Sequence, residues 1–94
     1  MVVIKIKALD ESIVFYSATI VEKLKVVKDV NTTKGEALQI DLVDGTQLYL
    51  DVIAASNTSL ATAINDAYIY NSVLYLIQQK EIEHKDSKWL KHEW

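Results

Sequence analysis

The sequence predicts a small, soluble α+β domain: an antiparallel β-meander of about four or five strands, then a long helix and a short Trp-containing tail helix. Apolar and polar residues alternate over much of residues 1–55, as expected of strands with one buried face. Near Ser56 the composition changes, and from Leu60 the apolar residues recur at helical spacing. We therefore divide one domain, 1–94, into a β-meander (1–55), a packing helix (58–80) and a tail (81–94).

The first half of the chain reads as strands in sequence order. Within residues 2–8, apolar residues at the even positions alternate with Val3, Lys5 and Lys7, which indicates one dry and one wet face. Residues 13–20 are rich in β-branched and aromatic residues, which favour strands. An apolar stripe at helical spacing also runs from Leu9 to Leu24, with Asp10 as its N-cap, so 13–24 is either strand or helix. Residues 24–30 continue as a strand.

Two alternating runs around Asp44-Gly45 predict a β-hairpin over residues 36–53. A two-residue loop would place polar residues opposite the apolar face. A three-residue loop, 43–45, pairs Leu38 with Leu50 and Ile40 with Leu48, which makes one face consistently apolar. Because a slip of one residue turns every side chain to the other face, we expect the second register. Asp41 and Asp51 then face outward and are solvated.

The second half predicts one helix over 58–80. Its polar start, 56–59, offers several N-caps, and the apolar side chains widen the stripe beyond one face. A helix that is apolar on most sides has to be buried on more than one side, and a small sheet covers only one. We therefore expect a homo-oligomer, a dimer or larger, in which a second copy covers the surplus. The stripe comprises Leu60, Ile64, Ala67, Asn71, Leu74 and Ile77.

The composition excludes several classes of function. The chain has a net charge of −3, and all ten of its basic residues are lysines. Arginine is the preferred contact to phosphate and guanine, so we expect no nucleic-acid partner. Without cysteine the chain has no disulfide and no thiolate zinc site. No apolar run reaches the roughly 18 residues of a membrane span, and no signal peptide is visible, so we expect a cytoplasmic protein without a membrane partner.

Candidate chemistry is sparse. Glu81 and His84 share a Glu-x-x-His spacing, which on a helix turns both side chains to one side. Diiron bundles use two such pairs and two further carboxylates. This chain has one pair, and its only other histidine is His92. We interpret Glu81 and His84 as weak metal candidates and expect no metal. No nucleophile elbow or phosphate loop is present, so we expect no cofactor and no enzyme activity.

Aromatic residues are the strongest candidates for an interface. Tyrosine is enriched at interfaces because it combines a large apolar area with a polar tip. Two tryptophans close to the end of the sequence also have large apolar areas that are unfavourable in water. We therefore expect the tail to pack on its own domain, on a second copy or on another protein. The interface candidates are Tyr68, Tyr70, Tyr75, Trp89, Leu90 and Trp94.

Three hypotheses of function remain from the sequence. The first is a non-enzymatic protein-interaction module that associates with itself through the helix and the tail. The second is a small inhibitor or adaptor of the phage or mobile-element type that binds a host protein. The third is a small-ligand or metal-dependent enzyme. We find no motif that identifies a family, and the biological role and the partner's identity are not encoded in any recognisable pattern.

Overall fold

A computed structural model describes residues 2–80 of the chain. This part contains six strands and one helix, which follow one another along the chain in the order βββββαβ. The strands form a single mixed sheet with the spatial order β2-β1-β6-β5-β4-β3. The elements are β1 (Ile4–Lys7), β2 (Ile13–Tyr16), β3 (Val21–Lys28), β4 (Glu36–Leu42), β5 (Gln47–Ala54), α1 (Leu60–Tyr70) and β6 (Leu74–Lys80).

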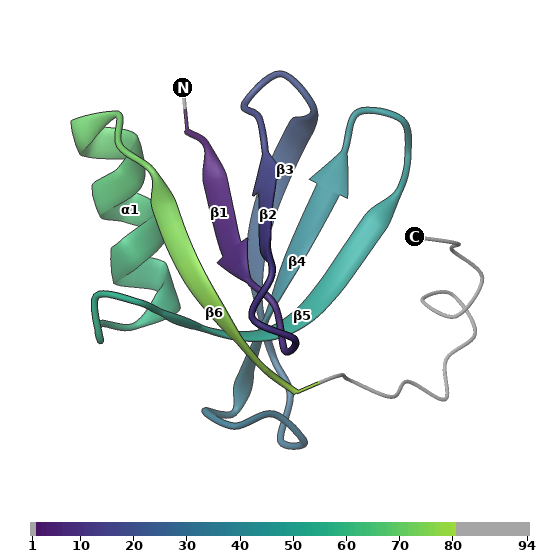
Figure 1. The fold of residues 1–94 in the computed structure, drawn as a ribbon, viewed down its shortest axis with the longest axis vertical. Coiled ribbons are helices and arrows are strands. Elements are labelled where there is room, and N and C mark those ends of the chain that lie inside the picture. Colours follow the sequence, from purple (N-terminus) through teal and green to yellow (C-terminus); the bar gives the residue numbers. More distant parts are fainter. Residues whose placement is uncertain (1, 81–94) are drawn as a thin grey trace.

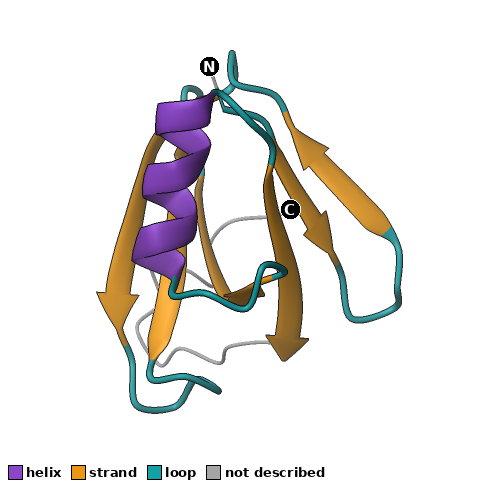
Figure 2. Ribbon diagram, turned by 90° about the vertical axis from the view of Figure 1, so that its left-hand side faces the viewer, coloured by secondary structure: helices purple, strands orange, loops and turns teal. Residues whose placement is uncertain are grey.

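The sheet curves around the helix. Figure 1 shows the strands fanning out beside α1, and in Figure 2 the two edge strands lie at opposite sides of the view with the helix between them. We call the face that carries the helix the inner face and the opposite one the outer face. The inner face holds the core, because Ile4, Leu38, Ile40, Leu74 and Leu76 are almost fully buried there together with helix residues.

The predicted hairpin register is confirmed. β4 and β5 pair antiparallel with Leu38 opposite Leu50 and Ile40 opposite Leu48. The amide of Leu42 donates to the carbonyl of Thr46 across the loop, and Gly45 has a φ of 91°. A side chain at this φ would be strained, which is why the loop uses glycine.

The predicted long helix over 58–80 is wrong. Helix α1 has 11 residues and ends at Tyr70. Asn71 adopts the left-handed conformation, with φ 51° and ψ 45°, and its amide donates to the carbonyl of Ala67. The amide of Ser72 donates to the same carbonyl at 3.0 Å, so two bonds close the helix at its C-terminus.

The second half of the predicted helix is strand β6. Leu74 and Leu76 are buried while Tyr75 and Ile77 lie on the outer face, which is the two-residue period of a strand. Burying a leucine stabilises by about 1.5–3 kcal/mol, whereas helix propensities of ordinary residues differ by less than about 0.7 kcal/mol. The core contacts of the two leucines therefore outweigh any local preference for helix.

The predicted β-meander is also wrong. β3, β4 and β5 follow one another antiparallel, and β1 and β2 form a hairpin, but β2 and β3 lie at opposite edges. β6 enters between β1 and β5, parallel to the first and antiparallel to the second. The architecture is therefore a mixed sheet with one short helix. Residues 13–24, for which helix and strand were both open, contain β2, a turn and the first part of β3.

The predicted tail helix over 81–94 lies outside the described residues. Among residues 2–80, no helix is both long enough and apolar enough to cross a membrane.

Candidate functional site

Strand β2 exposes apolar side chains on both faces of the sheet. Phe15 is 61% exposed and Ile13 is 42% exposed on the outer face, and Val14 is 38% exposed on the other side of the strand. Only Tyr16 of this strand packs against the core. We call Ile13, Val14 and Phe15 the β2 margin. The strand that sequence analysis found rich in aromatic and β-branched residues is thus poorly covered.

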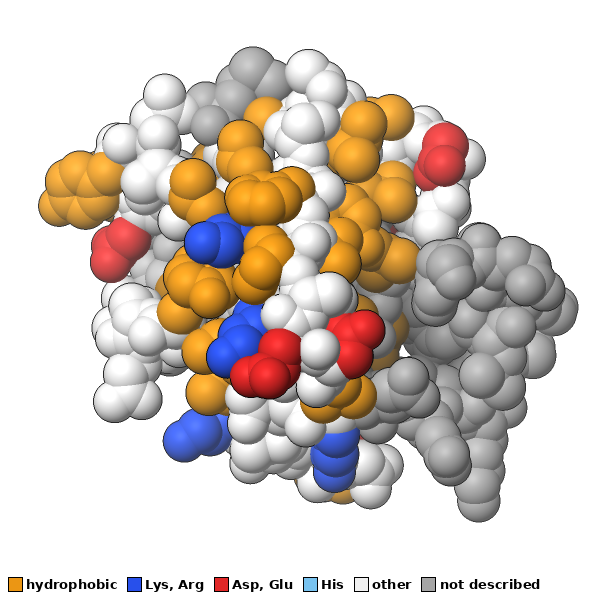
Figure 3. Space-filling model, in the orientation of Figure 1, with side chains coloured by type: hydrophobic (Ala, Val, Ile, Leu, Met, Phe, Trp, Pro, Cys, Tyr) orange, Lys and Arg blue, Asp and Glu red, His pale blue; other side chains and the backbone are white. Residues whose placement is uncertain are grey.

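The β2 margin continues into two rows of side chains on the outer face. Lys5 lies opposite Phe15 on one side and Tyr75 on the other, and Lys7 lies likewise between Ile13 and Ile77. The Lys5 ammonium lies 4.5 Å from the centre of the Tyr75 ring and 6.0 Å from that of Phe15, within reach of a cation–π interaction. Figure 3 shows hydrophobic side chains gathered over this part of the sheet, with lysines between them.

The backbone of the β2 margin also has groups that point away from the sheet. The amide of Ala8 donates to the carbonyl of Ser12 at 2.8 Å, and this pair belongs to the same register as the β1–β2 ladder. In an antiparallel ladder, residues that exchange hydrogen bonds alternate with residues that do not. Val14 therefore bonds β1, while the amides and carbonyls of Ile13 and Phe15 point outward from the edge of the sheet.

The other edge of the sheet, β3, is built differently. Its sequence carries Glu22, Lys23, Lys25 and Lys28, and its pairing with β4 shifts register between Val21 and Lys23. Charged side chains and bulges are the usual means by which an edge strand avoids pairing with another chain. β2 has none of these features, because its four residues, Ile-Val-Phe-Tyr, are all uncharged and regularly paired with β1.

The sequence-predicted interface residues fall in different places. Tyr68 and Tyr70 are exposed on the last turns of α1. Tyr75 lies on strand β6, where the Lys5 ammonium sits over its ring on the outer face, and is not part of a helix. The remaining candidates, Trp89, Leu90 and Trp94, and the weak metal candidates, Glu81 and His84, lie outside the described residues.

Sequence reasoning missed Ile13, Val14 and Phe15 as surface residues. It treated their apolar character as a sign of strand formation alone. The available signal was the absence of any charge from residues 13–16, in contrast to the other predicted strands, each of which carries at least one charged residue. That an apolar strand would lie at an edge depends on the topology, which no local pattern of the sequence reveals.

Comparisons with protein-family models, with curated proteins and with solved structures found no match to this chain. The site must therefore be interpreted from its own geometry.

Apart from the β2 margin, a polar cluster holds the loop between β3 and β4 against β5. Asp51 is only 1% exposed, and its Oδ2 accepts hydrogen bonds from the amide and the hydroxyl of Thr33, at 3.1 and 3.0 Å. The Tyr49 hydroxyl donates to Asp29 at 2.9 Å. Burial of Tyr49, together with this bond and the charge of Asp29, raises the Tyr49 pKa to about 12. The prediction that Asp51 is solvated is wrong, because the loop covers it.

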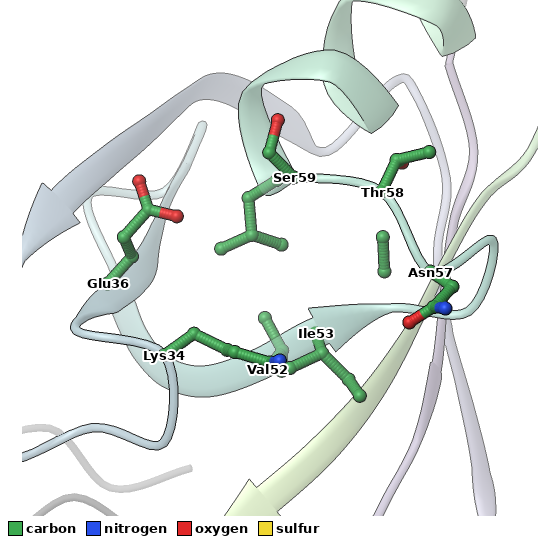
Figure 4. A pocket seen from close by; sticks show the side chains of 9 residues that line it. Lys34, Glu36, Val52, Ile53, Asn57, Thr58 and Ser59 are labelled. Carbon is green, nitrogen blue, oxygen red and sulfur yellow. The ribbon is translucent and has the colours of Figure 1, made fainter.

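A hollow of about 330 Å³ lies where the N-terminus of α1 meets β5. Val52 and Leu60 provide apolar walls, and Lys34, Glu36 and Asn57 contribute polar groups. In Figure 4 the Glu36 and Asn57 side chains lie on opposite sides of the hollow, and the Ser59 hydroxyl points out of it. Ser59 caps the helix by accepting from the amide of Thr62. These polar groups do not converge on one point, as they do in specific ligand sites.

Within residues 2–80, no three His, Asp or Glu side chains are grouped so that they could hold a metal ion. The β2 margin is therefore the candidate functional site of the described structure.

Proposed function

We propose that this chain is a non-enzymatic interaction module that associates with itself, and that the β2 margin is its interaction surface. The observation that carries the proposal is an uncharged edge strand whose side chains are exposed and whose outward backbone groups have no partner strand within residues 2–80. Such an edge is a ready template for another chain. The proposal keeps the interaction module predicted from the sequence and moves its surface from the helix to the sheet.

The exposed end of α1 supports an interface less well. Tyr68, Ile69 and Tyr70 are more than half exposed, but they offer side chains alone. The β2 margin offers apolar side chains and backbone hydrogen-bonding groups together. Backbone groups give a strand-pairing interface much of its affinity, so the two kinds of contact reinforce each other at β2.

Substituting Phe15 tests the surface. We expect Phe15→Asp to lower the average mass in solution, measured by size exclusion with light scattering at a matched concentration. An aspartate at this position places a charge on the edge, which opposes pairing, while Lys5 beside it compensates the new charge within the monomer. The fold should therefore persist, which circular dichroism would check.

Val30→Asp is the matched control. Val30 is 93% exposed in the loop between β3 and β4, at the other end of the sheet order, so the same change of charge should leave the mass unaltered. Equal masses for the wild type and Phe15→Asp would contradict the proposal. A wild-type chain that remains monomeric but pairs with another protein through Phe15 would favour the adaptor hypothesis instead.

A further inference from the structure

We propose that two copies of the chain associate by antiparallel pairing of their β2 strands about a two-fold axis, which joins two six-stranded sheets into one. This geometry, which rests on the self-association proposed above, follows from three features of β2. They are the direction of its backbone groups, the absence of charge, and its position at one end of the sheet order. Among residues 2–80, no other strand lies beyond β2 in the sheet order, and in Figure 2 it lies at the margin of the described part of the molecule.

The backbone selects one register. The outward groups belong to Ile13 and Phe15, because Val14 bonds β1. Placing Ile13 opposite Phe15 of the second copy, and Phe15 opposite Ile13 of the second copy, satisfies the outward groups of both strands at once. A shift by two residues in either direction would bring in Glu11, whose φ is 68°, or Ser17, which lies beyond the end of β2.

The side chains fit the same register. Phe15 would pack against Ile13 of the second copy on the outer face, and pairs of an aromatic and a β-branched residue stabilise antiparallel strands. The two Val14 side chains would meet at the two-fold axis on the opposite side of the strand. No like charges face each other, since the residues opposite Asp10 and Glu11 would be Ala18 and Ser17. The same operation on β3 would gather lysines.

The size of the contact sets its strength. Stable dimers bury about 800 Å² on each partner. A four-residue strand with its neighbours offers less area for such a contact than a long edge strand does. We therefore expect a reversible dimer whose population rises with concentration. We favour a second copy as the partner because the same strand in each copy offers outward amides and carbonyls that can bond to those of the other. In this register no charged residue lies opposite a residue of the same charge.

A disulfide at the axis tests the register. In a pair of residues that do not exchange hydrogen bonds the Cα atoms are about 4.5 Å apart, which a disulfide can span. The chain has no cysteine, so Val14→Cys introduces one thiol, and we expect the purified full-length variant to form a disulfide-linked dimer under mild oxidation. Val30→Cys lies in the β3–β4 loop and is more exposed than Val14, at 93% against 38%, yet it should remain at the background level of crosslinking.

A mixture of two further variants provides an independent readout. Ile13→Cys and Phe15→Cys, mixed, should crosslink with each other more readily than either does with itself, because those positions are opposite in the proposed register. Circular dichroism verifies that each variant folds. If Val14→Cys does not fold, the mixture of Ile13→Cys and Phe15→Cys still tests the register.

The outcomes separate the geometry from the proposed function. A dimeric mass without crosslinking above the Val30→Cys level would overturn β2 pairing and leave self-association standing. A monomeric mass at every concentration would overturn both. Crosslinking through Val14→Cys that disappears when Phe15→Asp is added would support both.

Discussion

Asp51 is the residue whose environment departs furthest from the pattern around it. Its position on β5 alternates with the core residues, so the sequence indicates an outward, solvated carboxylate. The loop from β3 to β4 folds over this position, and Thr33 donates two hydrogen bonds to one carboxylate oxygen. The other oxygen is buried and has no hydrogen-bond partner among the described residues, 2–80. Asp51 thus fastens a loop to the sheet.

We expect Asp51→Ala to destabilise the fold by about 1–3 kcal/mol, because two part-buried hydrogen bonds from Thr33 to a carboxylate are lost. Asp51→Asn keeps an acceptor oxygen and should cost less. Urea denaturation followed by fluorescence measures both. Asp66→Ala, on the exposed side of α1, is the control and should stay within about 0.5 kcal/mol. An Asp51→Ala variant as stable as this control would show that Asp51 does not fasten the loop.

At the scale of elements, the end of the helix decides the fold. An apolar run of 73–77 fits both a helix and a buried strand by periodicity alone, so the sequence could not separate the two. Asn71 separates them, because asparagine is among the few residues that enter the left-handed region readily. An Asn–Ser pair in the middle of a predicted helix was a sign of its C-terminus.

Substitution of Asn71 distinguishes the two structures by the order of stability. We expect Asn71→Val to be less stable than Asn71→Gly, since a β-branched residue in the left-handed conformation costs about 1–2 kcal/mol, and glycine adopts it freely. In a continuous helix the order would reverse, because glycine is the poorer helix former. Thermal melting of the two variants gives the order directly, and a more stable Asn71→Val would contradict the helix end described here.

The hairpin and the sheet order illustrate what sequence can and cannot predict. The β4–β5 register follows from parity, because both partners lie close in the chain and one apolar face had to be consistent. The pairing of β1 with β6 joins the beginning of the described chain to its end, and no local pattern encodes it. The position of β2 at an edge follows from that pairing, so the candidate site was equally beyond the reach of sequence reasoning.

At the scale of the whole molecule, the exposed apolar side chains lie in a different place from the one that the sequence predicts. The sequence attributed the apolar surplus to one long helix that a partner would have to cover. In the structure Leu74 and Leu76 complete the core from β6, and exposed apolar side chains remain at the β2 margin and at the end of α1. The expectation of a partner persists as a proposal, but it now concerns the edge of a sheet, where backbone and side chains act together.

The central claim is that the chain associates with itself through this edge. Sedimentation equilibrium of the unmodified, full-length chain over a wide range of concentrations tests it most directly. We predict an average mass that rises from the monomer value of 10.7 kDa toward twice that value as the concentration increases. A mass that stays at 10.7 kDa up to the solubility limit would contradict the claim.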